Sequence, residues 1–95
     1  MSKVKNEEFR VVVFNDGGSY VAQCLEHDIC AQAIDVKTLR HRMDAVIEAE
    51  REYARSLGKS LVESVGPAPK HFFDMWEKAW GSEQKSGDMR LALCA

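Results

Sequence analysis

The sequence predicts a single α+β domain: a small antiparallel sheet of three to four strands packed on one long helix, with a shorter C-terminal helix nearby. Two stretches of strand-forming residues flank an Asn-Asp-Gly-Gly turn. Apolar residues then recur at three- and four-residue spacing over 37–57. A length of 95 residues allows one modest core and little for a second unit.

The first strand is expected over Phe9–Phe14, which is rich in β-branched and aromatic residues. It is apolar on both faces beyond Arg10, which indicates an inner position or a strand covered on both sides. Residues 15–18 suit a tight turn, because glycine accepts a positive φ without penalty. The partner strand, Ser19–Leu25, alternates, with Tyr20, Ala22 and Cys24 on one face and Val21, Gln23 and Leu25 on the other.

A loop at 26–28 leads to a short third strand over Ile29–Ile34, a weaker strand pattern because alanine dominates it. The long helix is expected from about Lys37 to Leu57. Asp35 or Thr38 can accept a bond from a free backbone N–H at its start, and Gly58 can cap its end. The apolar face of this helix comprises Leu39, Met43, Val46, Ile47, Tyr53, Ala54 and Leu57.

The pattern is less regular in the last third of the chain. Ser60–Val65 fits a fourth short strand or an extended linker, and a second helix is expected over about Pro69–Trp80. We therefore divide the chain into a polar lead (1–8), one domain (9–80) and a C-terminal tail (81–95). Within that tail, Met89–Leu93 can pair as an edge strand or dock on another chain.

Composition excludes several classes of function. A net charge of −2 gives no electrostatic case for nucleic-acid binding. No apolar run approaches the ~20 residues that span a bilayer, and residues 1–6 lack the apolar stretch of a signal peptide. We therefore expect a cytoplasmic protein, in which the three cysteines are reduced thiols.

Residues 9–50 carry a pattern known from one family. An apolar first strand and the acidic glycine turn lead into Ser19-Tyr20-Val21-Ala22-Gln23-Cys24-Leu25-Glu26. A crossing segment, 28–33, then precedes a helix that contains Thr38-Leu39 and continues to Glu50. The aromatic-Val-Ala step and the Thr-Leu helix start resemble the HicB-like antitoxin family most closely.

The resemblance implies a sheet packed on a helix, similar to a truncated ribonuclease H fold, and no enzymatic activity or cofactor. Members of that family bind and block HicA, a small basic toxin that cuts messenger RNA. Many members also carry a C-terminal helix-turn-helix or ribbon-helix-helix domain that binds their own promoter. This chain departs from that pattern, because one apolar helix and a short tail follow Val65, with no basic recognition helix. The departure puts DNA binding by this chain in doubt.

Acidic residues offer an independent clue to a partner. Between Val11 and Val36 the sequence has four acids and no Lys or Arg. Such a surface can attract a HicA-like toxin or a related small basic protein; alternatively, the loops are simply polar. The predicted partner-binding residues are Asp16, Glu26, Asp28 and Asp35.

Two other functions stay open at this point. A degenerate or active ribonuclease H-like nuclease would need clustered carboxylates to hold divalent metals, whereas Asp16 and Asp28 fall in different loops and Asp44 and Glu48 on the solvent face of the helix. An RNA-binding module would need exposed aromatic residues on the sheet, and Tyr20 is the single strand candidate. The basic helix residues that could contact phosphates are Arg40, Arg42, Arg51 and Arg55.

A metal site is not expected. Cys24, His27 and Cys30 are loosely spaced for zinc, which takes paired ligands plus a second pair. Cys24 is expected inside the sheet packing, as a small buried thiol. The same residues do not make a nucleophile–base pair, because nothing orients the base.

The second helix predicts self-association, because it is apolar over more than half its circumference. One side, with Phe72, Trp76 and Ala79, can close the core of the domain. The other side has few partners in a short chain, unless Met89–Leu93 folds over it, and would form an exposed apolar patch. We therefore expect a homodimer or higher homo-oligomer, with an interface made by Phe73, Met75, Trp76 and Trp80.

Overall fold

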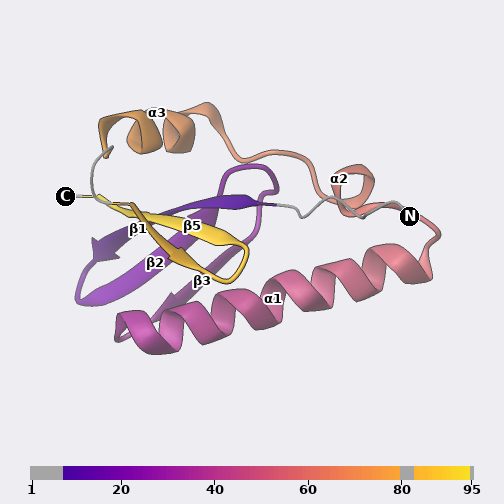
Figure 1. Ribbon diagram of the computed structural model, residues 1–95, viewed down its shortest axis with the longest axis horizontal. Helices are drawn as coiled ribbons and strands as arrows, with labels where there is room; N and C mark the ends of the chain where they lie inside the picture. Colours follow the sequence, from indigo (N-terminus) through magenta and orange to yellow (C-terminus); the bar gives the residue numbers. More distant parts are fainter. Residues whose placement is uncertain (1–7, 80–82, 95) are drawn as a thin grey trace.

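The structure, a computed structural model, describes residues 8–79 and 83–94. These residues form an α+β fold with one five-stranded sheet, a long helix and two shorter helices (Figure 1). In chain order the elements are β1 (Phe9–Asp16), β2 (Ser19–Cys24), β3 (Cys30–Ala33), α1 (Val36–Ser56), α2 (Leu61–Ser64), α3 (Lys70–Lys78), β4 (Glu83–Ser86) and β5 (Met89–Leu93).

The sheet has the strand order β3-β2-β1-β5-β4 and is mixed. The pairs β1–β2, β2–β3 and β4–β5 are antiparallel, whereas β1 and β5 run parallel. The expected sheet of three to four antiparallel strands is therefore wrong in strand number and direction. The predicted inner position of the first strand is confirmed, because β1 lies at the centre of the sheet.

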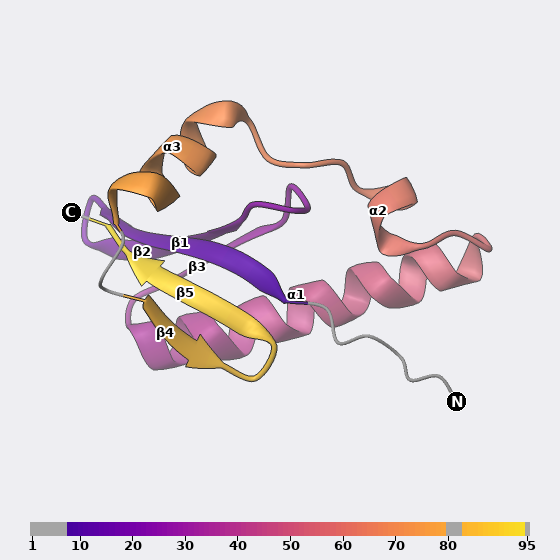
Figure 2. The same ribbon diagram turned by 45° about the horizontal axis from the view of Figure 1, so that its top comes forward.

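The two longer helices cover opposite faces of the sheet (Figure 2). The α1 face carries the main core, which includes Val11 and Val13 from β1, Cys24 from β2 and Leu39 and Met43 from α1. All five of these side chains are at most 1% exposed. The other face is covered over β1 by α3. The central strand therefore needs apolar side chains pointing in both directions, as its sequence indicates.

The termini of α1 follow the predicted capping chemistry. Asp35 is the N-cap, and its Oδ1 accepts from the Thr38 backbone N–H at 2.7 Å. At the other end Gly58 has a φ of 72°, and the Lys59 N–H donates to the Ala54 carbonyl at 2.9 Å. That pair of features is the Schellman arrangement, which stops the helix.

The segment Ser60–Val65 is neither a strand nor an extended linker, because it contains the short helix α2. The Ser60 side chain accepts from the Glu63 N–H, and the Glu63 carboxylate accepts from the Ser60 N–H at 2.8 Å. This reciprocal capping box supplies partners for the free amides of a helix start. The predicted second helix corresponds to α3, which begins directly after Pro69.

The segment predicted as a tail contributes two strands to the sheet. A turn with Gly87 at a φ of 65° joins β4 to β5. Met89–Leu93 is not an edge strand, because β5 lies between β1 and β4. Met89 and Leu91 are buried in the α1-side core. The predicted polar lead (1–8) lies outside the described residues, apart from Glu8.

Candidate protein-binding surface

The four predicted acidic residues do not form one patch, because the sheet separates them into two pairs. Asp16 ends β1 opposite Ser19, and Asp35 follows β3, which runs in the same direction as β1. Glu26 and Asp28 lie in the loop after β2, at the opposite end of the sheet. Five residue steps along β1 separate the two ends, roughly 17 Å.

Glu26 is bound within the protein. Its Oε1 accepts from the Arg10 backbone N–H at 2.8 Å, and its Oε2 accepts from Arg10 Nε. Both side chains are about one-third exposed, at 33% for Arg10 and 31% for Glu26. A carboxylate held in this way carries little net charge for a partner, so Glu26 contributes less to an acidic surface than the sequence indicates.

Asp28 and Asp35 each have a structural bond but remain exposed. Asp28 Oδ1 accepts from Gln23 Nε2 at 2.9 Å, which satisfies a buried amide side chain. Asp35 caps α1, and the hydrogen bond from the Thr38 N–H holds the pKa of its carboxyl below the usual value. Both side chains therefore remain accessible to a partner.

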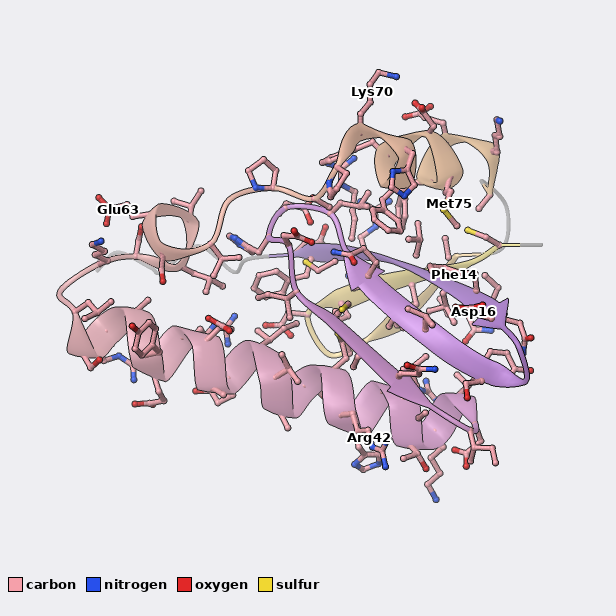
Figure 3. The ribbon with its side chains drawn as sticks, turned by 180° about the vertical axis from the view of Figure 1, so that it is seen from behind. Phe14, Asp16, Arg42, Glu63, Lys70 and Met75 are labelled. Atoms are coloured by element: carbon pink, nitrogen blue, oxygen red, sulfur yellow. The ribbon has the colours of Figure 1, made fainter. Side chains whose placement is uncertain are left out.

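Asp16 is the most available of the four acids. It is exposed at the tip of the β1–β2 hairpin, where Figure 3 shows its side chain. Among the described residues we find no ion pair to its carboxylate. A free carboxylate on a projecting turn is well placed to meet a cation on another molecule.

Between the two acidic ends, part of the sheet face opposite α1 is uncovered. Ala31 and Ala33 pair with Ala22 and Tyr20 and turn toward the core, so Cys30 and Gln32 turn away from α1. Both are exposed, and Ile34, the next residue but one, is 77% exposed. We call this surface the open face; its residues are Val21, Cys30, Gln32 and Ile34.

Phe14 and Phe72 form the border between the open face and α3. Their rings stack with centroids 6.2 Å apart and an interplanar angle of 25°. Phe14 belongs to β1 and Phe72 to the first turn of α3, so this contact fixes how far α3 extends across the sheet. The open face begins on the side of this pair where β2 and β3 lie.

The predicted oligomer interface on α3 is largely used within the chain. The Arg10 guanidinium lies 5.5 Å from the Phe73 ring centroid and 5.9 Å from that of Trp76, and Arg90 lies 5.4 Å from Trp76. Cys94 Sγ lies 3.8 Å from the carbonyl oxygen of Met75, whose side chain points from α3 toward the sheet in Figure 3. Phe73, on the side of the helix expected to have few partners, therefore contacts Arg10. Trp80 lies outside the described residues.

The candidate metal and nucleophile residues do not converge. Burial raises the pKa of the Cys24 thiol to about 11, so this thiol stays protonated at neutral pH. The buried ring of His27 packs on Phe9, with centroids 5.6 Å apart, and its Nδ1 lies 3.3 Å from the Val65 carbonyl oxygen. Cys30 is exposed on the open face. Within residues 8–79 and 83–94, no three His, Cys, Asp or Glu side chains are arranged to hold a metal ion.

Three of the four candidate basic residues of α1 are engaged within the chain. Arg42 donates to the Gln32 carbonyl at 2.7 Å, and Arg55 donates to Glu52 at 2.6 Å. Arg51 binds Glu48 and Asp88, and its guanidinium lies over the ring of Phe9. Tyr20, the candidate stacking residue, packs against the core. Tyr20 therefore offers little exposed ring on which an RNA base could stack.

Sequence reasoning missed the open face, although a signal for it was present. In the third strand Ala31 and Ala33 alternate with Cys30, Gln32 and Ile34, so one face had to be the less buried one. The missing information was that α3 lies over β1 and leaves this region uncovered. No family model, curated protein or solved structure matches the chain. Among the described helices, none has the length and apolar character needed to cross a membrane.

Proposed function

We propose that this chain is a HicB-like antitoxin-type protein, which neutralises a HicA-like, messenger-RNA-cleaving toxin by binding it. One observation carries the proposal: an uncovered sheet face lies between two acidic ends, one of which also carries the exposed Ile34. A polar rim around exposed apolar residues is common in protein interfaces. The rim of the open face has Asp16, Ile34 and Asp35 at one end and Asp28 at the other.

Of the acids at this rim, Asp16 is the one that most favours a basic partner, because Lys37 and Arg42 already lie near the Asp35 carboxylate. No Lys or Arg occurs between Val11 and Val36, and at least Asp16 keeps a carboxylate without a partner among the described residues. Like-signed charges around a binding surface increase the rate at which an oppositely charged protein associates, and they reject acidic competitors. A small RNA-cleaving toxin is basic because it must bind phosphates, so its charge would complement this rim.

The strand connections are compatible with the truncated ribonuclease H-like fold that this family would have. Three antiparallel strands are followed by a helix and then by a strand parallel to the first. The described residues after α3 form β4 and β5 in the same sheet as β1, and this proposal assigns DNA binding to none of them. In this proposal the protein is not an enzyme, requires no cofactor and acts in the cytoplasm.

The test is to capture the tagged protein from its own cells and to identify what copurifies. The expected result is a small basic protein at a fixed ratio, which cleaves messenger RNA alone and stops doing so when this chain is added back. Copurification of RNA without such a protein would overturn the proposal in favour of an RNA-binding module. A captured basic protein that cleaves RNA equally well in the presence of this chain would also overturn it.

Two matched variants then locate the binding surface. Asp16→Lys and Asp44→Lys make the same charge change at exposed positions, one beside the open face and one on the outer side of α1. We expect Asp16→Lys to slow association with the toxin several-fold at low salt, because the Coulomb attraction is screened at high salt. Asp44→Lys should associate at nearly the wild-type rate. Equal effects of both variants would mean that the toxin binds elsewhere.

A further inference from the structure

The free edge of β3 presents unpaired backbone groups. Cys24 N–H donates to the Ile29 carbonyl at 2.9 Å, so alternate residues of β3 bond to β2 and the amides of Cys30 and Gln32 point outward. The Gln32 carbonyl accepts from Arg42 Nη1 of α1. An outward row of N–H and C=O groups is completed by another extended strand.

The two edges of the sheet differ in how they are protected. The edge strand β4 carries Lys85, which forms an ion pair with Glu8 at 3.0 Å. A charged side chain on an edge strand discourages pairing with another chain. The β3 strand itself, Cys30-Ala31-Gln32-Ala33, has no charged residue and no proline, and the charge that reaches its edge is the Arg42 guanidinium bound to the Gln32 carbonyl. The β3 edge is therefore the one on which strand addition is favourable.

The flank of α1 beside this edge is also suited to close contact. Arg42, Ala45 and Ala49 follow one another at three- and four-residue spacing, so they share the side of α1 from which Arg42 reaches β3. All three are exposed, and the two alanines allow another backbone to approach closely. The outer side of the helix instead carries charged residues, among them Lys37, Asp44, Glu48 and Arg55.

We propose that the β3 edge together with this α1 flank, Arg42, Ala45 and Ala49, forms a two-fold interface between two copies of this chain. We call this surface the β3–α1 edge. A two-fold axis makes two copies of β3 antiparallel neighbours and brings the two α1 helices together at the same time. Because α1 packs against both β3 and β2, the helix axes would lie about 10 Å apart, which is a normal packing distance.

A second copy fits this surface better than an unrelated strand does. A partner on this surface must offer an edge strand and a helix flank of small residues at a fixed distance from each other. A second copy of the chain has both. The charged residue of the surface, Arg42, is held on the Gln32 carbonyl, and the other residues of the surface are uncharged. The Arg42–Gln32 bond can persist, because a carbonyl oxygen has a second lone pair for an N–H of the partner strand. The two open faces would then join into one continuous surface.

The test is the molar mass in solution, measured by light scattering over micromolar to millimolar concentrations. The wild type is expected at twice the chain mass of 10.7 kDa. Gln32→Pro removes an outward N–H, while the bonds to β2 come from neighbouring residues, so the dimer should weaken at least tenfold in an intact fold. Ala45→Glu should weaken it similarly, because a long side chain replaces the alanine that lets the two helices approach closely.

Lys37→Gln is the matched control. It changes the net charge by one unit, as Ala45→Glu does, but Lys37 lies on the outer side of α1 and not on the flank beside β3. It should dimerise like the wild type. A wild type that stays monomeric throughout would overturn the proposal, as would a dimer that survives both Gln32→Pro and Ala45→Glu. If Gln32→Pro does not fold, the comparison of Ala45→Glu with Lys37→Gln decides. Toxin binding by a monomeric wild type would overturn this interface and leave the proposed function standing.

Discussion

The two longer helices are attached to the sheet in different ways. The long helix α1 has 21 residues, capping bonds at both ends and four buried residues: Leu39, Met43, Ile47 and Ala54. The shorter helix α3 has nine residues, no side-chain cap at its start and no buried residue. Its large side chains contact Arg10, Arg90 and Phe14 instead. Burial of aliphatic side chains holds α1, whereas aromatic and cation–π contacts hold α3.

The linker before α3 compensates for part of this difference. The Asp28 N–H donates to the Gly66 carbonyl at 2.7 Å, and the Ala68 N–H donates to the Leu25 carbonyl at 3.0 Å. These two bonds tie the linker to the loop between β2 and β3. The helix α3 is therefore expected to open more easily than α1, because few fully buried apolar contacts oppose its opening.

The largest effect is expected from the core beneath α1. Leu39 is 0% exposed, and Leu39→Ala should lower the free energy of unfolding by about 2–5 kcal/mol through lost burial and a cavity. Phe73→Ala, on half-buried α3, should cost clearly less although it removes more atoms. Urea unfolding followed by circular dichroism measures both. A Phe73→Ala cost equal to that of Leu39→Ala would contradict the distinction between the helices.

The next effect concerns Arg10, which joins β1 to α3. Arg10→Met should cost about 1–2 kcal/mol, because it removes the contacts with Phe73 and Trp76 and leaves Glu26 with the backbone N–H of residue 10 but without the guanidinium. Solvent screening of this partly exposed pair keeps the cost modest. Hydrogen exchange should show the loss of protection concentrated in α3, and Arg10→Lys should restore part of it. Equal loss of protection in α1 would mean that the two helices open together.

A smaller effect is expected where α1 ends. Gly58→Ala should cost about 1 kcal/mol, because a φ of 72° is strained for any residue with a Cβ. Gly66→Ala is the matched control, because Gly66 lies in the linker to α3 without a positive φ and with no atom near an added Cβ. It should be neutral or slightly stabilising. Thermal unfolding of both variants distinguishes a strained C-cap from a general intolerance of alanine.

The smallest effect concerns the charge at the start of α1. Asp35→Asn keeps a capping oxygen, so at neutral pH it removes only the attraction between the carboxylate and the helix N-terminus. The pKa of Asp35 is lowered in the folded state, so its extra stabilisation is present above the unfolded pKa and is lost as pH falls through the folded pKa. Urea unfolding at a series of pH values should therefore show the stabilities of the wild type and the Asp35→Asn variant converging in acid. A constant difference at every pH would contradict this.

Local signals in the sequence were sufficient for the first half of the fold. The β1–β2 hairpin, the short β3 and both ends of α1 depend on residues within a few positions of one another, and all of them were predictable. The helix α2 was missed although its signal was local, since Ser60 and Glu63 form the sequence pattern of a capping box.

The pairing of β1 with β5 could not be predicted in this way. Phe9 pairs with Met89 across 80 residues of sequence, and no local pattern specifies such a partner. The candidate site shows the same limit. The sequence shows four acids in this segment. Only the folded sheet shows that they lie at its two ends and that the Glu26 carboxylate is bound by Arg10. Exposure of Ile34 depends on where α3 stops, which is likewise a tertiary property.

The position of β5 in the sheet has a consequence for biosynthesis. The last described strand, β5, pairs with β1, which lies near the other end of the chain. One edge of β1 therefore stays unpaired during synthesis until residue 93 has been made. During that time an apolar strand with an open edge is exposed to aggregation. A ribosome-bound nascent chain should therefore depend on a chaperone for a longer time than the formation of its local hairpin and helix would require.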